Sequence, residues 1–233
     1  MKRIGIIGAM EEEVEILKQR MDIKEVGQFA SMDFNSGAYD GREVVIVRSG
    51  IGKVNAAVCT QILADIYDVD LIINTGVAGS LDKAINIGDI VLSTDALQHD
   101  VDATVFGYAP GVIPRMETSV FKADAGLVEL AKEICTKVNP QIGVHTGRVV
   151  SGDQFVSDFQ VKGRLSNTFG GCCTEMEGAA IAQTSYLNHI PFLIIRAISD
   201  KADGSAQMDY DEFEAKAIEH TVKLMDGLIR AVE

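Results

Sequence analysis

Tryptophan is absent from this 233-residue sequence, and only four prolines occur in it. No stretch rich in proline, glycine or serine separates one part of the chain from another, and no internal repeat is present. Hydrophobic residues make up 47% of the chain, which is enough for a full core and argues against disorder. We therefore expect one domain that spans residues 1–233.

Basic residues are scarce as well. The chain has 21 Lys and Arg residues against 34 Asp and Glu residues, which gives a formal net charge of −13. No run of Lys or Arg, and no basic patch interleaved with aromatic residues, offsets this excess. Because a negative surface repels phosphate backbones, we expect no nucleic-acid partner.

Long hydrophobic runs are also missing. The apolar stretch at residues 4–8 is too short for a signal peptide, and no later run approaches the roughly 18 apolar residues of a membrane-spanning helix. The four cysteines, Cys59, Cys135, Cys172 and Cys173, have neither the spacing of a disulfide framework nor that of a metal knuckle. These absences predict a cytoplasmic protein with reduced thiols and no membrane partner.

The motifs of several cofactor-dependent enzymes are missing too. GxGxxG spacing does not occur, so NAD binding is not supported, and Ser49–Lys53 matches the phosphate-binding GxxxxGK[ST] loop only in part. The histidines form no HExxH pair, and the GxSxG motif of serine hydrolases does not occur. We expect no metal and no organic cofactor.

Short runs rich in Ile and Val alternate with amphipathic segments along the chain. Apolar runs separated by helices are typical of parallel strands covered on both sides, and Asp40-Gly41 between two such runs indicates a hairpin. We expect an α/β fold, a single-domain three-layer sandwich with a central mixed, largely parallel twisted sheet flanked by helices. The expected strands span residues 3–8, 34–39, 43–48, 71–75, 89–93, 148–151, 173–176 and 192–198, and the main expected helices span 10–21, 53–67, 124–138 and 210–232.

The stretch from residue 99 to residue 120 shows no clear hydrophobic period. It contains Gly107, Pro110, Gly111 and Pro114, which are typical of irregular backbone. Long loops in compact domains are usually functional. We therefore expect this loop to take part in binding.

Ligands of such sheets bind beyond the carboxyl ends of the strands. Four expected strand ends carry polar or glycine-rich residues, at 8–13, 76–79, 175–178 and 196–200. Three of these ends supply carboxylates. The fourth, Gly-Val-Ala-Gly at 76–79, supplies small residues that allow the backbone to approach a ligand closely.

Each of these carboxylates also has a purely structural explanation. The acidic run before the first helix suits a helix N-terminus, where the dipole is positive, although Glu13 flanks the apolar stripe and can point towards the strand ends. Glu175 and Glu177 share one face and can form a buried salt bridge with Arg196. Asp200 can cap a helix or close a turn.

Several segments taken together match one known family. They are residues 5–14, 49–54, 74–76, 150–153, 175–177 and 196–200, with His99-Asp100 and Phe106-Gly107-Tyr108 in the long loop. This set resembles the 5′-methylthioadenosine/S-adenosylhomocysteine nucleosidases of the purine nucleoside phosphorylase superfamily, and the match runs from the first strand to the last helix. The resemblance implies hydrolysis of the N-glycosidic bond of both nucleosides, and of 5′-deoxyadenosine, in methionine salvage. It ranks neither these substrates nor the aminofutalosine of menaquinone synthesis.

The resemblance also implies roles for particular residues. Glu13 is similar to the residue that activates the attacking water, and Asp200 to the proton donor for N7 of adenine, with Ser199 orienting it. This donor needs a protonated carboxyl near neutral pH, which a closed, dry site favours. Glu177 is similar to the ligand of the ribose hydroxyls, and Met176 to a contact on the face of the sugar.

The remaining implied contacts surround the base and the 5′ substituent. Phe155 is similar to the residue that stacks on the base, and the backbone of Val156 to the group that reads its polar edge. The apolar lining of the 5′ end would come from Met10, Ile51, Phe106 and Tyr210. Ala78, Gly79 and Arg196 complete the implied substrate-binding set.

Family members form homodimers, so the resemblance implies that loop 99–120 lies near the neighbouring site. Two residues depart from the family pattern. Val77 stands where many members have Ser, which removes a hydroxyl near the ribose. Tyr210 stands where Phe is frequent, which affects the 5′ end of the site.

The first strand end favours hydrolysis over phosphorolysis. No Lys or Arg follows Glu11, Glu12 and Glu13 until Lys18. A phosphate there would meet like charges, at a cost of roughly 4 kcal/mol for a contact of about 4 Å at an effective dielectric of about 20. The alternatives are a phosphorylase of the same fold and, from another class, a nucleoside-binding module without catalysis.

Overall fold

The protein is described by a computed structural model at residues 2–200 and 210–232, with no side chains described for 210–217. In this part of the chain ten strands form one sheet in the order β10-β6-β8-β9-β5-β1-β4-β3-β2, with β7 paired to β6. The strands are β1 (Ile4–Gly8), β2 (Asp22–Phe29), β3 (Met32–Tyr39), β4 (Arg42–Arg48), β5 (Leu71–Ser80), β6 (Ile90–Gln98), β7 (Phe121–Lys122), β8 (Val144–Ser151), β9 (Gly171–Glu175) and β10 (Phe192–Asp200). The helices are α1 (Glu15–Arg20), α2 (Lys53–Asp65), η1 (Thr104–Phe106), α3 (Ala125–Val138), α4 (Phe159–Phe169), α5 (Gly178–Leu187) and α6 (Tyr210–Ala231).

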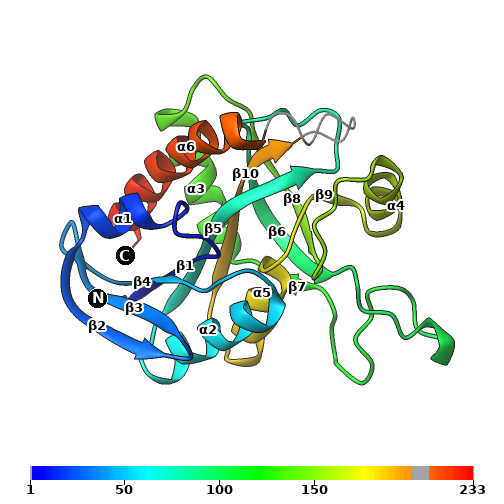
Figure 1. The fold of residues 1–233 in the computed structure, drawn as a ribbon, viewed down its shortest axis with the longest axis horizontal. Helices are drawn as coiled ribbons and strands as arrows, with labels where there is room; N and C mark the ends of the chain where they lie inside the picture. The colour runs from blue at the N-terminus through cyan, green and yellow to red at the C-terminus, as the bar shows by residue number, and fades with distance from the viewer. Residues whose placement is uncertain (1, 201–209, 233) are drawn as a thin grey trace.

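Helices cover both faces of the sheet, with α1, α3 and α6 on one side and α2 and α5 on the other (Figure 1). Successive side chains of a strand point to opposite faces. In β1, Ile6 belongs to a core cluster that includes Met225 of α6. Its neighbour Ile7 belongs to a second cluster with Cys59 of α2 and Ile181 of α5. This double burial explains why β1 is apolar throughout.

The pairing of the strands confirms an α/β fold with a mixed sheet, but not the expected excess of parallel pairs. Five pairings of the described strands are parallel (β1–β4, β1–β5, β5–β10, β6–β8 and β8–β9) and five are antiparallel (β2–β3, β3–β4, β5–β9, β6–β7 and β6–β10).

One of the antiparallel pairings comes from β5, which was expected to end at Thr75 but continues to Ser80. Its first half pairs with β1, whereas Gly79 and Ser80 pair antiparallel with β9. Because β10 pairs with both β5 and β6, strands β5, β9, β8, β6 and β10 close into a ring of pairings. A flat central layer therefore describes only part of the sheet.

The predicted hairpin is present, and a further strand precedes it. Asp40 and Gly41 have positive φ angles of 48° and 81°, as the turn between β3 and β4 requires. The sequence did not indicate the edge strand β2, whose apolar residues Ile23, Val26 and Phe29 recur every third position. The register shifts between Ile23 and Glu25, so the bulge breaks the alternation that marks a strand.

The expected long loop follows β6 and contains only η1 before β7 begins at Phe121. It projects away from the body of the molecule at the lower right of Figure 1. All four cysteines are free thiols. Among residues 2–200 and 210–232, no helix is long and apolar enough to cross a membrane.

Candidate active site

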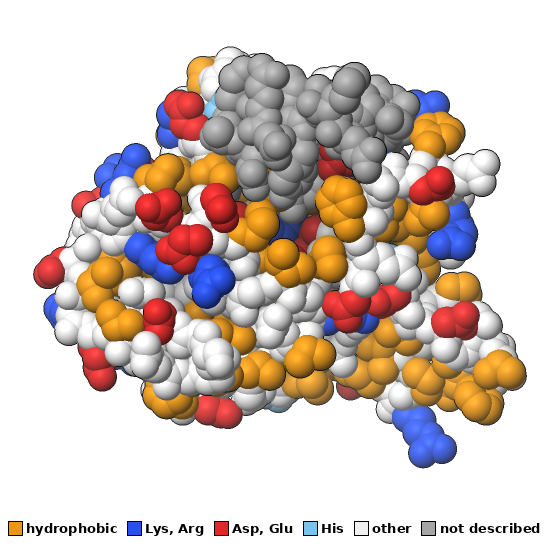
Figure 2. Space-filling view, in the orientation of Figure 1, with side chains coloured by type: hydrophobic (Ala, Val, Ile, Leu, Met, Phe, Trp, Pro, Cys, Tyr) orange, Lys and Arg blue, Asp and Glu red, His pale blue; other side chains and the backbone are white. Residues whose placement is uncertain are grey.

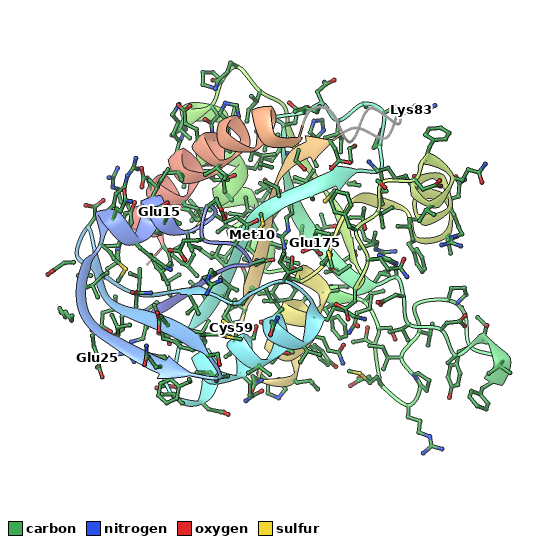
Figure 3. The ribbon with its side chains drawn as sticks, viewed as in Figure 1. Met10, Glu15, Glu25, Cys59, Lys83 and Glu175 are labelled. Carbon is green, nitrogen blue, oxygen red and sulfur yellow. The ribbon has the colours of Figure 1, made fainter. Side chains whose placement is uncertain are left out.

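One pocket joins the four strand ends singled out in the sequence. It contains about 610 Å³ of empty space, part of it open to solvent, which is a usual size for a small-molecule site. Figure 3 labels Met10 and Glu175, which reach the pocket from the ends of β1 and β9. The lining residues are Ala9, Met10, Glu13, Ile51, Val77, Ala78, Gly79, Gln154, Phe155, Val156, Thr174, Glu175, Met176, Glu177, Ser199 and Asp200.

Glu13 is held by backbone N–H groups from two strand ends. Its Oε2 accepts hydrogen bonds from Ala9 N at 2.6 Å and Met10 N at 3.0 Å, and its Oε1 accepts one from Val77 N at 3.1 Å. Helix α1 begins only at Glu15, so the preceding turn keeps these donors free for the carboxylate. Burial raises the pKa of Glu13, and the charge of Arg196 with the three N–H bonds opposes that rise.

Glu177 lies just beyond β9 and is 5% exposed. Its Oε1 accepts a hydrogen bond of 2.8 Å from Gly52 N. Burial, and then the negative charge of Glu175, raise the pKa of Glu177 to about 7. Segment 49–53, which resembles a phosphate loop only in part, therefore uses a backbone donor to hold a carboxylate.

Arg196 is 1% exposed and lies beneath the acidic groups. It forms an ion pair with Glu175, donates to Asn74 Oδ1 at 2.6 Å and lies 3.8 Å from Glu177 Oε2. The salt bridge expected from the sequence is thus present. Arg196 is not among the described residues that line the pocket, and it lies behind the carboxylates that do.

Asp200 ends β10 and is 3% exposed. Ser199 Oγ donates to its Oδ1 at 3.1 Å, and the Lys162 ammonium contacts its Oδ2. A Cβ on Gly79 would lie 2.9 Å from Oδ2, so this position admits no side chain without moving the carboxylate.

The sequence analysis did not identify Gln154 and Thr174, which line the pocket, or Lys162, which lies behind Asp200. Lys162 lies on α4 and is 1% exposed, which is rare for lysine. Leu165, three residues later, is also buried. A lysine at a core-facing position of an amphipathic helix was the available signal, but only the fold shows that its partner is Asp200, 38 residues away.

The first turn of α2 connects two loops near the pocket. Lys53 N donates to Asp153 Oδ1 at 2.8 Å, and Lys53 Nζ forms an ion pair with Asp100 at 2.6 Å. Asp153 N in turn donates to Asp100 Oδ2 at 3.0 Å. The start of the projecting loop and the segment before Phe155 are therefore both fixed to the residue that follows Gly52.

The apolar positions expected from the sequence divide between the pocket and its surroundings. Met10, Ala78, Val156 and Met176 line the pocket, as do Ile51 and Phe155 at its exposed rim. Phe106 does not line it in this chain and is 79% exposed on the projecting loop. The side chain of Tyr210 lies outside the described residues.

Comparison with known proteins identifies the family of the chain. A model of the phosphorylase superfamily matches residues 3–230. The 5′-methylthioadenosine/S-adenosylhomocysteine nucleosidase of Staphylococcus carnosus is 42% identical over 98% of this chain and 100% of the relative.

Two solved nucleosidases of the same name share the fold. The Neisseria meningitidis protein in complex with methylthio-immucillin-A is 38% identical with a TM-score of 0.93, covering 100% of both chains. The Colwellia psychrerythraea protein in complex with adenine is also 38% identical with a TM-score of 0.93, covering 98% of this chain and 95% of that one. The chain therefore belongs to the 5′-methylthioadenosine/S-adenosylhomocysteine nucleosidases of the phosphorylase superfamily.

Proposed function

We propose that this protein, acting as one unit over residues 1–233, hydrolyses the N-glycosidic bond of 5′-methylthioadenosine and S-adenosylhomocysteine in methionine salvage. Adenine and the corresponding 5-thioribose are the products, and 5′-deoxyadenosine is a further substrate. The observation that carries the proposal is the meeting of Glu13, Glu177 and Asp200 in one buried pocket. The names of its relatives agree with this assignment.

The three carboxyl groups suit the charges that develop in this reaction. Cleavage of a ribosyl bond passes through a sugar with oxocarbenium character. Glu13 and Glu177 would stabilise this positive charge, and Glu13 would also orient and activate the attacking water. Asp200 would protonate N7 of the departing adenine, and general acid catalysis of this kind contributes ~10²–10⁴-fold.

The charges around the pocket favour water over phosphate as the nucleophile. No Lys or Arg appears among the described residues that line the pocket. The two nearest buried cations, Arg196 and Lys162, are already paired with Glu175 and Asp200. Lys18, the first cation after the acidic run, pairs with Glu11 at the surface. Within residues 2–200 and 218–232, whose side chains are described, a phosphate anion would thus meet Glu13 and Glu177 without a free positive partner.

The apolar lining fits the rest of the substrate. Phe155, which is 63% exposed, would stack on the adenine, and the backbone of Val156 would read its polar edge. Met176 would lie against the sugar, and Met10 and Ile51 beside the 5′ substituent. Val77 contributes its N–H to Glu13 but has no hydroxyl, so the ribose would have one polar contact fewer here than in family members with Ser at this position.

We also propose a homodimer in which loop 99–120 covers part of the neighbouring site. Figure 2 shows hydrophobic side chains gathered on the projecting part of the molecule at the lower right. Val105 and Phe106 in this loop are 85% and 79% exposed, and Tyr108 is 37% exposed. Large exposed apolar patches usually mark contact surfaces.

The decisive experiment is to incubate the purified protein with each of the three nucleosides and measure free adenine, with and without phosphate. We expect adenine at a rate independent of phosphate, with oxygen from ¹⁸O-labelled water in the sugar product. Acceleration by phosphate with formation of a ribose 1-phosphate would show a phosphorylase instead. Tight binding without adenine release would show a nucleoside-binding module.

A further inference from the structure

The Asp200 carboxylate has a buried cation behind it. The Lys162 ammonium contacts Oδ2 of Asp200, and the two residues are 1% and 3% exposed. Asp200 lines the pocket, whereas Lys162 is not among the described lining residues. The carboxyl group therefore lies between the ammonium and the space that a ligand would fill.

The fold fixes this pair from three directions. Asp158 caps α4 by accepting a hydrogen bond of 2.9 Å from Val161 N, so the helix begins at a defined place and Lys162 lies on its buried face. Ser199 Oγ binds the other carboxylate oxygen, Oδ1, at 3.1 Å. On the remaining side, the backbone of Gly79 approaches so closely that an added Cβ would lie within 2.9 Å of Oδ2.

The other carboxylates at the pocket explain why a cation beside Asp200 would stabilise a negative charge there. Glu13 at the start of α1, Glu175 at the end of β9 and Glu177 beside α5 line the same pocket as Asp200. Among the described residues, the cation that pairs with this set of three glutamates is Arg196 of β10, which forms its ion pair with Glu175. A further negative charge on Asp200 is opposed by these carboxylates and balanced by Lys162.

We propose that Lys162 is a positioning residue for proton transfer to the leaving base, an inference that rests on the proposed function. It holds the Asp200 carboxyl towards the pocket and balances the anion that remains after the transfer. In this step the O–H bond of Asp200 breaks and an N7–H bond forms, while the bonding electrons of the glycosidic C–N bond pass to the purine. The oxygen of the attacking water bonds to C1′ and gives one proton to Glu13. Glu13 then releases this proton to solvent, and solvent restores the proton to Asp200.

The test separates charge from hydrogen bonding. Lys162→Gln keeps a hydrogen-bond donor, on a side chain one atom shorter, but removes the charge, whereas Lys162→Arg keeps the charge. Lys162→Met is a second neutral variant for a buried site. Arg164→Gln is the matched control, because it removes one positive charge from an exposed position of the same helix.

Two substrates distinguish proton transfer from simple structural support. Adenine needs a proton to depart, whereas the 4-nitrophenolate of a 4-nitrophenyl 5-methylthioriboside departs without one. We expect Lys162→Gln to lower kcat for adenine release roughly 10-fold or more, a part of the ~10²–10⁴ of general acid catalysis, with little change in KM. Nitrophenolate release should be unchanged in Lys162→Gln, and both reactions unchanged in Arg164→Gln.

Rescue by the conservative variant gives a second readout. Lys162→Arg keeps the charge that balances the Asp200 anion, so it should restore most of the adenine-release kcat that Lys162→Gln loses.

Equal slowing of both leaving groups in whichever neutral variant folds, or failure of Lys162→Arg to restore adenine release, would overturn the role of Lys162. Failure of the wild-type protein to release adenine would instead overturn the proposed function.

Discussion

Glu13 owes its position to three backbone N–H groups rather than to a side-chain partner. These donors bind a carboxylate but not the NH₂ group of an amide. We predict that Glu13→Gln lowers kcat by roughly 10²–10⁴-fold, because it removes the base that we propose activates the attacking water. Adenine release and circular dichroism of the variant test this. Near-wild-type turnover in a folded variant would remove Glu13 from the mechanism.

Glu177 gives the site a pH dependence of its own. Burial and Glu175 raise its pKa to about 7, so its carboxylate is mostly protonated below that pH and ionised above it. Ribose hydroxyls bind the ionised form more strongly as donors. We predict that affinity for a non-hydrolysable 5′-methylthioadenosine analogue falls as the pH decreases through about 7.

Calorimetric titrations of the wild type and Glu177→Gln across this range provide the measurement. The Gln variant should bind more weakly and without this pH dependence. A dependence that persists in Glu177→Gln would assign the titration to another group, such as Glu13, whose pKa is also raised by burial.

At the scale of the element, β5 decides the shape of the site. Its Gly76 lies in the strand, where a Cβ would come within 2.0 Å of Arg196 Nη1 and 2.5 Å of Glu13 Oε1. We predict that Gly76→Ala displaces this pair, costs ~1–3 kcal/mol of unfolding free energy and lowers turnover strongly. Urea unfolding and adenine release are the measurements.

The matched control is Gly163→Ala on α4, where an added Cβ meets nothing within 4 Å. This change should be neutral or stabilise by roughly 0.5–1 kcal/mol, since alanine favours helix. Equal effects at the two positions would argue against the close contact at Gly76.

The elements that the sequence predicted well are those with a clear hydrophobic pattern or a clear turn or cap signal. Strand β1, the β3–β4 hairpin and helix α3 agree with expectation within a few residues, and Asp124 caps α3 through Leu127 N. β5 was cut short because Gly76 and Gly79 look like a turn, whereas they are strand positions crowded by Glu13 and Asp200. Local composition cannot show a neighbour that arrives from another strand.

Tertiary contacts also explain which site residues the sequence could predict and which it could not. Glu13, Glu177 and Asp200 stand at strand ends, a place that topology predicts, and they lie together. Lys162 and the Gly52 N–H group reach the site through tertiary contacts that no spacing in the sequence predicts. Phe106 was expected at the pocket because of a family likeness, and it lies on an outer loop of this chain.

At the scale of the whole molecule, loop 99–120 exposes apolar side chains that a second copy of the chain would cover. We predict that Phe106→Asp converts a two-protomer species into single chains at micromolar concentration, because it buries a charge in the contact. Light scattering after size-exclusion chromatography measures the mass. Val26→Asp on β2, an exposed position on another part of the surface, should leave the mass unchanged. A wild-type protein that is a single chain at all concentrations would contradict the dimer.

The junction at Lys53 has a mechanical consequence. The consecutive backbone N–H groups of Gly52 and Lys53 donate to Glu177 and to Asp153, respectively, and the Lys53 ammonium pairs with Asp100 at the start of the outer loop. A displacement of that loop would therefore reach the Glu177 carboxylate through residues 52 and 53. Glu177 and the segment that follows Asp153, which are separate in the sequence, would move together.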